Sequence, residues 1–94
     1  MRTRSFHIRI EGHTDNVPIR PGGGYSTNME LSGLRAASVV EYMIRQYGID
    51  PTTISFAGYG QYKPIAENVT SEGRRKNRRV DIVILSETAK SLEP

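Results

Sequence analysis

The sequence predicts an α+β fold, a small mixed β-sheet with helices packed on one face. Three strand patterns lead to this prediction. Apolar and polar residues alternate over residues 6–11, and β-branched or apolar runs follow at 53–58 and 80–85. A helical pattern occupies 27–47, and a shorter basic one occupies 71–76. This alternation of strands and helices, in a chain of 94 residues, is typical of one small layered domain.

The first predicted strand ends at Glu11, and Gly12 follows it. Residues 13–16 are polar and predict a loop, which the glycines at 22–24 extend toward the main helix. A glycine-rich connection of this kind is either flexible or closely approached by another group. The rim of the sheet next to this loop is therefore a candidate binding region.

The main helix has clear start and stop signals. Thr27 is a candidate N-cap, and Glu30 completes a capping box. Gly48 suits a left-handed C-cap, and Pro51 prevents continuation. Spacings of three and four predict one buried stripe, made of Leu31, Leu34, Ser38, Val39, Tyr42 and Met43.

The helix between the first two strands predicts a right-handed crossover between parallel neighbours. The third strand is apolar enough at its end to be central, and its direction stays open. Three strands and about one and a half helices make a thin core. We therefore expect either that a strand and a helix precede Arg4, or that another chain covers an open edge of the first strand.

Bulk properties exclude several classes of protein. The net charge of +3 is too mild to indicate nucleic-acid binding by itself. The chain has no cysteine, so a disulfide framework and a thiolate metal site are both excluded. No apolar run approaches the roughly 20 residues that span a bilayer, and no signal segment opens the sequence.

Polar residues that core packing does not require gather at predicted strand ends and helix starts. Asp15 follows the first strand, Asn28 begins the main helix, Arg35 lies about two turns further on, and Arg78 precedes the last strand. A carboxylate facing two guanidiniums suits a zwitterionic ligand. Two simpler interpretations stay open, an Asx turn made by Asp15 and a plain salt bridge between Asp15 and Arg35.

Short sequence blocks spread along the chain form an ordered set. They are Gly12-His13-Thr14-Asp15-Asn16, Asn28-x-x-Leu31-Ser32-x-x-Arg35-Ala36, Gly58-Tyr59-Gly60, Pro64, Asn68, Gly73-Arg74 and Asn77-Arg78-Arg79-Val80. Together they closely resemble the OmpA-like peptidoglycan-binding domain, over about residues 8–85. A set of blocks in the right order is far more specific than any one short motif.

This resemblance implies a ligand and a role for each residue. The ligand is the diaminopimelate residue of the peptidoglycan stem peptide, held without covalent chemistry. The aspartate matched by Asp15 takes its ammonium group, and the arginine matched by Arg35 takes its carboxylate. The positions matched by Asn28 and Arg78 support the site, and Thr14 is placed to offer a hydroxyl. The resemblance implies no enzyme activity, no cofactor and no metal.

The block at 12–19 and the long glycine-rich connection after it are most like the flagellar stator members of the family. This similarity implies a homodimer, a membrane stator partner subunit, and a place in the periplasm or at the extracytoplasmic face of the inner membrane. An outer-membrane-to-wall tether is the alternative. Family domains normally begin with a further strand and helix, so we interpret 1–94 as one N-terminally truncated domain with a core at 6–85 and a loose tail at 86–94.

Three rival interpretations rest on other residues. Zinc held by His7, His13 and a carboxylate is one. A hydrolase built on Ser26, His13 and Asp15 is another, but the sequence lacks the Gly-x-Ser-x-Gly turn that such a nucleophile needs. Nucleic-acid binding through the basic run at 74–79 is the third, although no stacking aromatic residues lie near that run.

Overall fold

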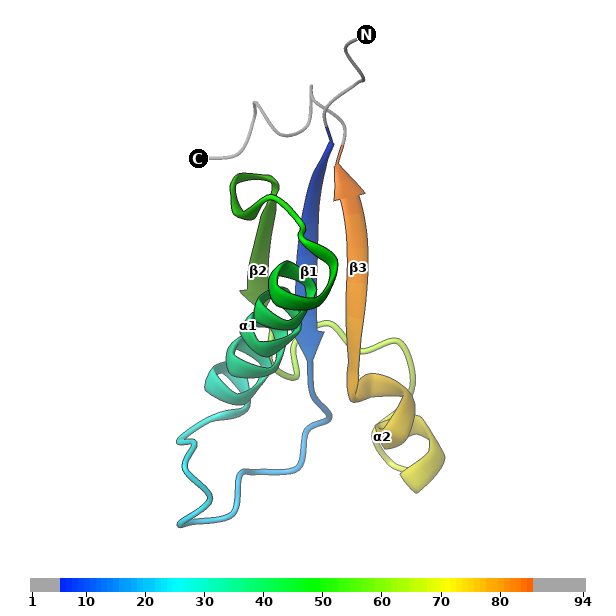
Figure 1. Ribbon diagram of the computed structural model, residues 1–94. Helices are drawn as coiled ribbons and strands as arrows, with labels where there is room; N and C mark the ends of the chain where they lie inside the picture. The colour runs from blue at the N-terminus through cyan, green and yellow to red at the C-terminus, as the bar shows by residue number, and fades with distance from the viewer. Residues whose placement is uncertain (1–5, 86–94) are drawn as a thin grey trace, which may run out of the picture.

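The computed structural model describes residues 6–85, so the predicted loose tail at 86–94 lies outside the described residues. The strands are β1 (His7–His13), β2 (Ile54–Gly58) and β3 (Arg79–Leu85). The helices are α1 (Asn28–Tyr47) and α2 (Ser71–Asn77), with a short 3₁₀ turn, η1, at Pro51–Thr53. The sheet has the order β2-β1-β3, with β1 parallel to β2 and antiparallel to β3 (Figure 1). The predicted α+β class and mixed sheet are confirmed.

The predicted ends of α1 are confirmed by their capping contacts. The side chain of Thr27 accepts a hydrogen bond from the Glu30 amide at 3.1 Å. The Glu30 carboxylate accepts one in turn from the Ser26 amide at 2.6 Å, one residue earlier than a standard capping box. Gly48 closes the helix with φ 65°, and its N–H donates to the carbonyl of Ile44.

The predicted buried stripe of α1 is partly wrong. Leu34, Ser38 and Tyr42 are exposed, and Leu31, Val39 and Met43 are only partly buried. The buried positions are instead spaced by four and mostly small: Asn28, Ser32, Ala36 and Val40. The small side chains allow the helix backbone to approach the glycines of the sheet closely, and this approach rotates the buried side of α1 away from its largest apolar residues.

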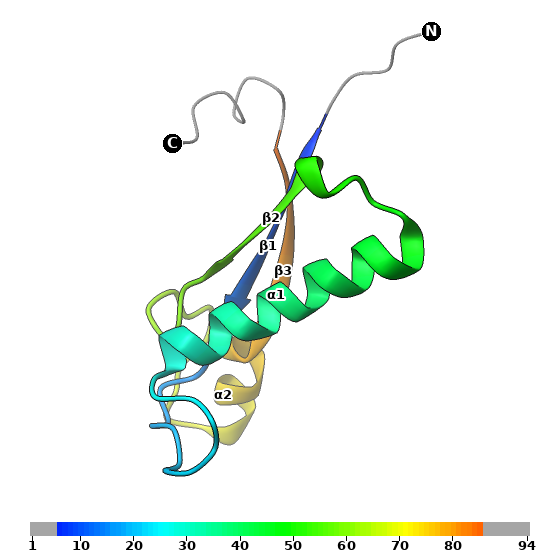
Figure 2. The ribbon, with the colours of Figure 1, turned by 60° about the vertical axis from the view of Figure 1, so that its left-hand side comes forward.

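The core lies between α1 and the two strands beneath it. Its buried apolar residues are Ile10, Ala36, Val40 and Ile54. α1 packs mainly across β1 and β2, as Figure 2 shows from the side. The residues of β3 that face the same side as Ile10 are left exposed: Val80, Ile82 and Ile84.

Two expectations about the strands are corrected. The last strand, expected to be central, lies at an edge, and β1 is the central strand, with partners on both sides. β1 therefore has no open edge for another chain to cover. The apolar end of β3 was misleading, because its apolar residues Val80, Ile82 and Ile84 lie exposed at the edge of the sheet and are not buried at its centre.

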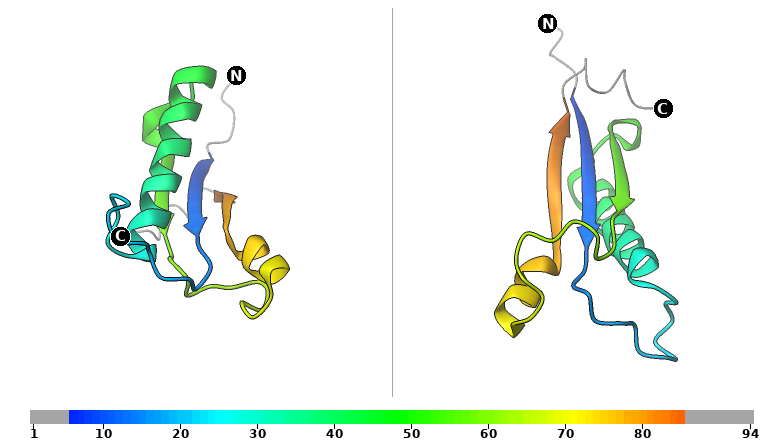
Figure 3. Two further views of the ribbon diagram at one scale, coloured as in Figure 1. Left: turned by 90° about the horizontal axis from the view of Figure 1, so that it is seen from below. Right: turned by 180° about the vertical axis from the view of Figure 1, so that it is seen from behind.

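α2 and the connection before it lie at one end of the sheet rather than on a face. α2 sits beyond the start of β3 (Figure 1), and the connection at 59–70 crosses the end of β1 (Figure 3, right). Among the helices of residues 6–85, α1 is therefore the one that covers a face of the sheet. Within residues 6–85, no helix is both long and apolar enough to cross a membrane.

Candidate ligand site on the sheet rim

Four chain segments meet at one rim of the sheet, as the sequence predicts. β1 and β2 end there because they are parallel, and β3 starts there because it is antiparallel to β1. Two backbone hydrogen bonds tie the ends together, from the Tyr59 amide to Gly12 O at 3.0 Å and from the Thr14 amide to Gly60 O at 2.9 Å. α1 begins beside them, because the Gly60 amide donates to the Ser32 hydroxyl at 2.9 Å.

The backbone around Asp15 is held from three sides. The Val17 amide donates to Asp15 Oδ1 at 3.0 Å, so the Asx turn considered from the sequence is present. The Thr14 hydroxyl and the Asn28 amide both donate to the carbonyl of Asp15, at 2.8 and 3.2 Å. Asp15 is buried. Its second carboxylate oxygen, Oδ2, is thus aimed by a rigid loop.

Asp15 Oδ2 accepts a hydrogen bond from Arg78 Nη1 at 2.7 Å. The Asp15 side chain is 10% exposed and the Arg78 side chain 44% exposed, so the guanidinium lies between the buried carboxylate and solvent. The salt bridge expected for Asp15 exists, but its partner is Arg78 and not Arg35. The guanidinium keeps further N–H groups that Asp15 does not occupy.

Arg35 is exposed on α1 and, within residues 6–85, its side chain forms no ion pair or hydrogen bond. A Cβ on Gly58 would lie 2.5 Å from Gly33 N, so Gly33 faces the end of β2. Arg35 follows Gly33 by about 200° around the helix. It therefore lies on the flank of α1 that points away from β2, toward the β3 side.

Asn28 and Thr14 hold the loop rather than face solvent. The Nδ2 group of Asn28 also donates to Val17 O at 3.0 Å and to Gln61 Oε1 at 3.3 Å. Both residues are buried. The sequence predicts that they belong to the site, and the structure places them behind Asp15.

A cavity of about 510 Å³ opens next to this loop. It borders Asn28, the residue that holds the Asp15 loop, and both ends of the glycine-rich connection. Its lining carries no charged side chain and consists of Asn16, Pro18, Ile19, Ser26, Thr27, Asn28, Met29, Gln61 and Tyr62.

Comparison with known proteins places these features in a family. Residues 1–78 match the model of the OmpA family. The chain belongs to the OmpA family. Motility protein B of Bacillus subtilis (strain 168) is 46% identical to it over 79 residues, which are 84% of this OmpA-family chain and 30% of that relative.

Solved structures share the fold of this OmpA-family chain. The periplasmic domain of Helicobacter pylori MotB superposes with a TM-score of 0.80 and 37% identity, over 93% of this chain and 52% of that one. The cell wall anchor of the T6SS from Pseudomonas aeruginosa superposes with a TM-score of 0.78 and 33% identity, over 89% and 57%.

His13 has a setting in this OmpA-family domain that was not predicted. It was expected in the polar loop, but β1 extends through it, and the residue is only 3% exposed. Its ring stacks on Tyr59 with centroids 5.3 Å apart. Burial first, and then the charge of Arg79, lower the pKa of His13 below its usual value. The alternation of residues 7, 9, 11 and 13 was the signal that could have extended the strand.

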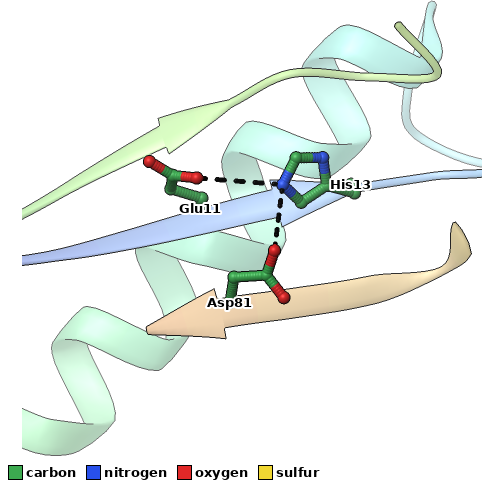
Figure 4. Close-up of side chains that lie close together, drawn as sticks. All are labelled: Glu11, His13 and Asp81. Atoms are coloured by element: carbon green, nitrogen blue, oxygen red, sulfur yellow. Dashed lines mark ion pairs between the residues drawn. The ribbon is translucent and has the colours of Figure 1, made fainter. Parts of the chain in front are cut away.

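The structure does not assemble the rival zinc and hydrolase sites. His7 Nε2 is 2.8 Å from the Ser55 hydroxyl, away from His13. The ring of His13 faces Glu11 and Asp81 instead of Asp15 (Figure 4). Across residues 6–85, no hydrogen bond joins Ser26, His13 and Asp15.

The basic run of the OmpA-family domain is largely used by the chain itself. Arg74 donates to the carbonyl of Asn68 at 2.8 Å, and Arg78 pairs with Asp15. Arg79 donates to Asp81 Oδ2 at 3.0 Å and to the carbonyl of Lys63 at 3.2 Å. Contacts of this kind do not form the continuous basic stripe that tracks a nucleic-acid backbone.

Proposed function

We propose that this domain anchors a larger envelope protein to the cell wall by non-covalent binding of the peptidoglycan stem peptide. The observation that carries the proposal is the Asp15–Arg78 pair at the sheet rim. Asp15 is aimed by its locked loop, and Arg78 presents free guanidinium N–H groups to solvent. Membership of the OmpA family supports this function, as does the likeness to a structure described as a cell wall anchor.

The ligand group would be the zwitterionic end of diaminopimelate. Asp15 would accept its ammonium group, and Arg78 would hold its carboxylate while remaining bonded to Asp15. Arg35 would approach from the flank of α1, where its guanidinium is exposed and has no bond within the described chain. Asn28 and Thr14 would keep the Asp15 loop in shape rather than bind the ligand.

Such a site would bind one stem peptide weakly. Each charge-assisted hydrogen bond nets about 1.5–3 kcal/mol, and part of that is spent on ordering the side chains. Anchoring would therefore depend on several domains acting together on one polymer. A homodimer would supply this avidity, and the sheet edges open for pairing are β2 and β3.

The proposed setting is the periplasm, on a protein held at the inner membrane. Support comes from Motility protein B and from the H. pylori structure, whose description is of a periplasmic domain. The chain spans 30% of Motility protein B, so a stator partner subunit would contact other parts of the protein that carries this domain. The proposed function requires neither an enzymatic reaction nor a cofactor.

Co-sedimentation with purified sacculi tests this function. We expect Asp15→Asn, Arg78→Gln and Arg35→Gln to stay in the supernatant while the unmodified chain sediments. Asp15→Asn keeps an oxygen for the Val17 amide, so it removes the charge with little change to the loop. A soluble stem peptide that contains diaminopimelate should release the bound domain, and the same peptide with lysine, whose side chain ends in an ammonium group without a carboxylate, should not.

Arg45→Gln is the matched control. Arg45 is also an exposed arginine of α1, but it lies in the last turn beside Glu41. Losing its charge should leave sedimentation unchanged. Equal binding by all the variants, or equal loss in Arg45→Gln, would overturn the site. Binding of labelled DNA with steep salt dependence, and none to sacculi, would favour the nucleic-acid interpretation.

A further inference from the structure

A second cluster of titratable side chains lies on the face of the sheet opposite α1. Glu11 and His13 are two residues apart in β1, so their side chains point to the same side of the sheet. Asp81 of β3 is the direct cross-strand partner of Glu11. The two carboxylates converge on one nitrogen of the His13 ring (Figure 4). The proposed peptidoglycan site does not use this cluster.

The His13 ring lacks the hydrogen bonds that its burial demands. Neither ring nitrogen has a hydrogen-bond partner among the described residues. Nε2 lies 3.6 Å from Asp81 Oδ2 and 4.0 Å from Glu11 Oε1, and both distances are too long for hydrogen bonds. A buried imidazole without partners is costly, so its presence calls for a further group in the cluster.

A divalent metal ion fits this spacing. Two ligand atoms, each about 2.1 Å from a tetrahedral ion, lie about 3.4 Å from each other. One ligand atom from each of Glu11, His13 and Asp81 falls within 4.8 Å of the others. Small side-chain rotations would bring the three atoms into range. The ion would take the lone pair of Nε2 and leave only the other ring nitrogen without a partner.

Each carboxylate is also hydrogen-bonded to an arginine, and metal-binding carboxylates are usually held by such a neighbour. Arg9 Nε donates to Glu11 Oε2 at 2.8 Å, which leaves Oε1 directed at the histidine. Arg79 Nε donates to Asp81 Oδ2 at 3.0 Å, and this oxygen is also the one nearest His13 Nε2, so Arg79 holds the Asp81 carboxylate at the cluster. The Asp81 side chain is 43% exposed, and this provides a route by which an ion can enter.

The charges around the cluster select the class of metal. The guanidiniums of Arg9 and Arg79 balance the two carboxylates, and Lys63 adds a positive charge near Tyr59. Calcium and magnesium depend on several oxygen ligands and on net negative charge, which the cluster does not offer. Zinc, cobalt and nickel gain much of their affinity from imidazole.

The rival explanation is an ion pair made by protonated His13. A close ion pair would bring His13 Nε2 into hydrogen-bond contact with a carboxylate, but Nε2 lies 3.6 Å from Asp81 Oδ2 and 4.0 Å from Glu11 Oε1. This spacing leaves room for an ion between the three side chains. We propose that Glu11, His13 and Asp81 bind one zinc-class transition-metal ion, with water completing its coordination.

Zinc binding by the tag-free 94-residue chain tests the site. After treatment with a chelator, equilibrium dialysis against Zn²⁺ should yield one ion per chain. His13→Gln and Asp81→Asn should each weaken binding by at least about 10- to 100-fold, because losing only a residue behind a ligand already costs that much. In NMR spectra, Zn²⁺ should move the imidazole signals of His13 and leave those of His7 in place.

His7→Gln is the matched control. It removes the only other histidine, from the same strand and the same face, and it should bind Zn²⁺ like the unmodified chain. Asp81→Asn changes a partly exposed side chain, so it decides the test even if His13→Gln fails to fold. Absence of stoichiometric binding, unchanged affinity in Asp81→Asn, or equal loss in His7→Gln would overturn the proposal.

Discussion

Gly12 sets how closely α1 approaches the sheet. A Cβ at this position would collide with the carbonyl oxygen of Ser32 and press on Ala36. Both contacts come from the buried side of the helix, and the carbonyl is part of its backbone and cannot rotate away. In the sequence, Gly12 was identified only as the residue after the first predicted strand and as the start of a motif block. Its tight packing against α1 brings Gly12 next to Ser32, which lies 20 residues further along the chain. A local sequence pattern cannot predict a contact between residues so far apart.

Gly12→Ala should lower the free energy of unfolding by about 1–3 kcal/mol, because α1 must move off the sheet. Gly33→Ala is the paired variant, since a Cβ there meets nothing within 4 Å. It should raise the free energy of unfolding by up to about 1 kcal/mol through helix propensity. Urea unfolding measures both variants, and equal stability of the two would contradict the packing described here.

At the scale of elements, Asn77 organises the connection before α2. It is fully buried, and its Oδ1 accepts from the amides of Ile65 and Ala66 at 2.8 and 3.0 Å. Its Nδ2 donates to Ala66 O and to Asn68 Oδ1, both at 2.9 Å. The next residue is Arg78. The asparagine was identified from the sequence only as part of a motif, and the structure assigns it the task of holding the backbone that carries the site arginine.

Asn77→Ala should destabilise the domain by at least about 2 kcal/mol, because each buried group left without a partner costs about 1–3 kcal/mol. The amides of Ile65 and Ala66 should lose their protection in hydrogen exchange. Asn68→Ala removes only the Asn68 end of this network and should cost clearly less. If both variants unfold at the same urea concentration, the network does not have the role described.

At the scale of the whole molecule, the sheet is covered unevenly. α1 lies over β1 and β2, and the helix-facing side of β3 forms an apolar strip of Val80, Ile82 and Ile84. Ile82 is 60% exposed and Ile84 65% exposed. β3 is also an edge strand, so its backbone is available to another strand. An apolar surface on an open edge favours self-association of the isolated domain.

Replacing both Ile82 and Ile84 with threonine should reduce that self-association, as measured by sedimentation velocity at rising concentration. The free energy of unfolding should change little, since surface substitutions usually stay within about 0.5 kcal/mol each. Ile10→Ala, in the buried core, should instead cost about 2–5 kcal/mol. Unchanged sedimentation of the double variant would mean that the strip does not drive association.

Local patterns in the sequence are enough to define the helices, the strands and the rim of the sheet. Thr27, Glu30 and Gly48 defined the main helix because capping is local chemistry between neighbouring residues. The ordered blocks predicted that Asp15, Asn28 and Arg78 lie together at the rim of the sheet. In the structure, the parallel and antiparallel strands bring these three residues together there.

The partners of the polar side chains, in contrast, follow from contacts between distant segments. Asp15 pairs with Arg78 rather than Arg35, because β3 runs antiparallel to β1 and starts beside its end. The tertiary structure also decided that β1 is central and that His13 faces Glu11 and Asp81. These contacts depend on strand order and register. Both arise from the packing of distant segments, and not from the sequence immediately around each residue.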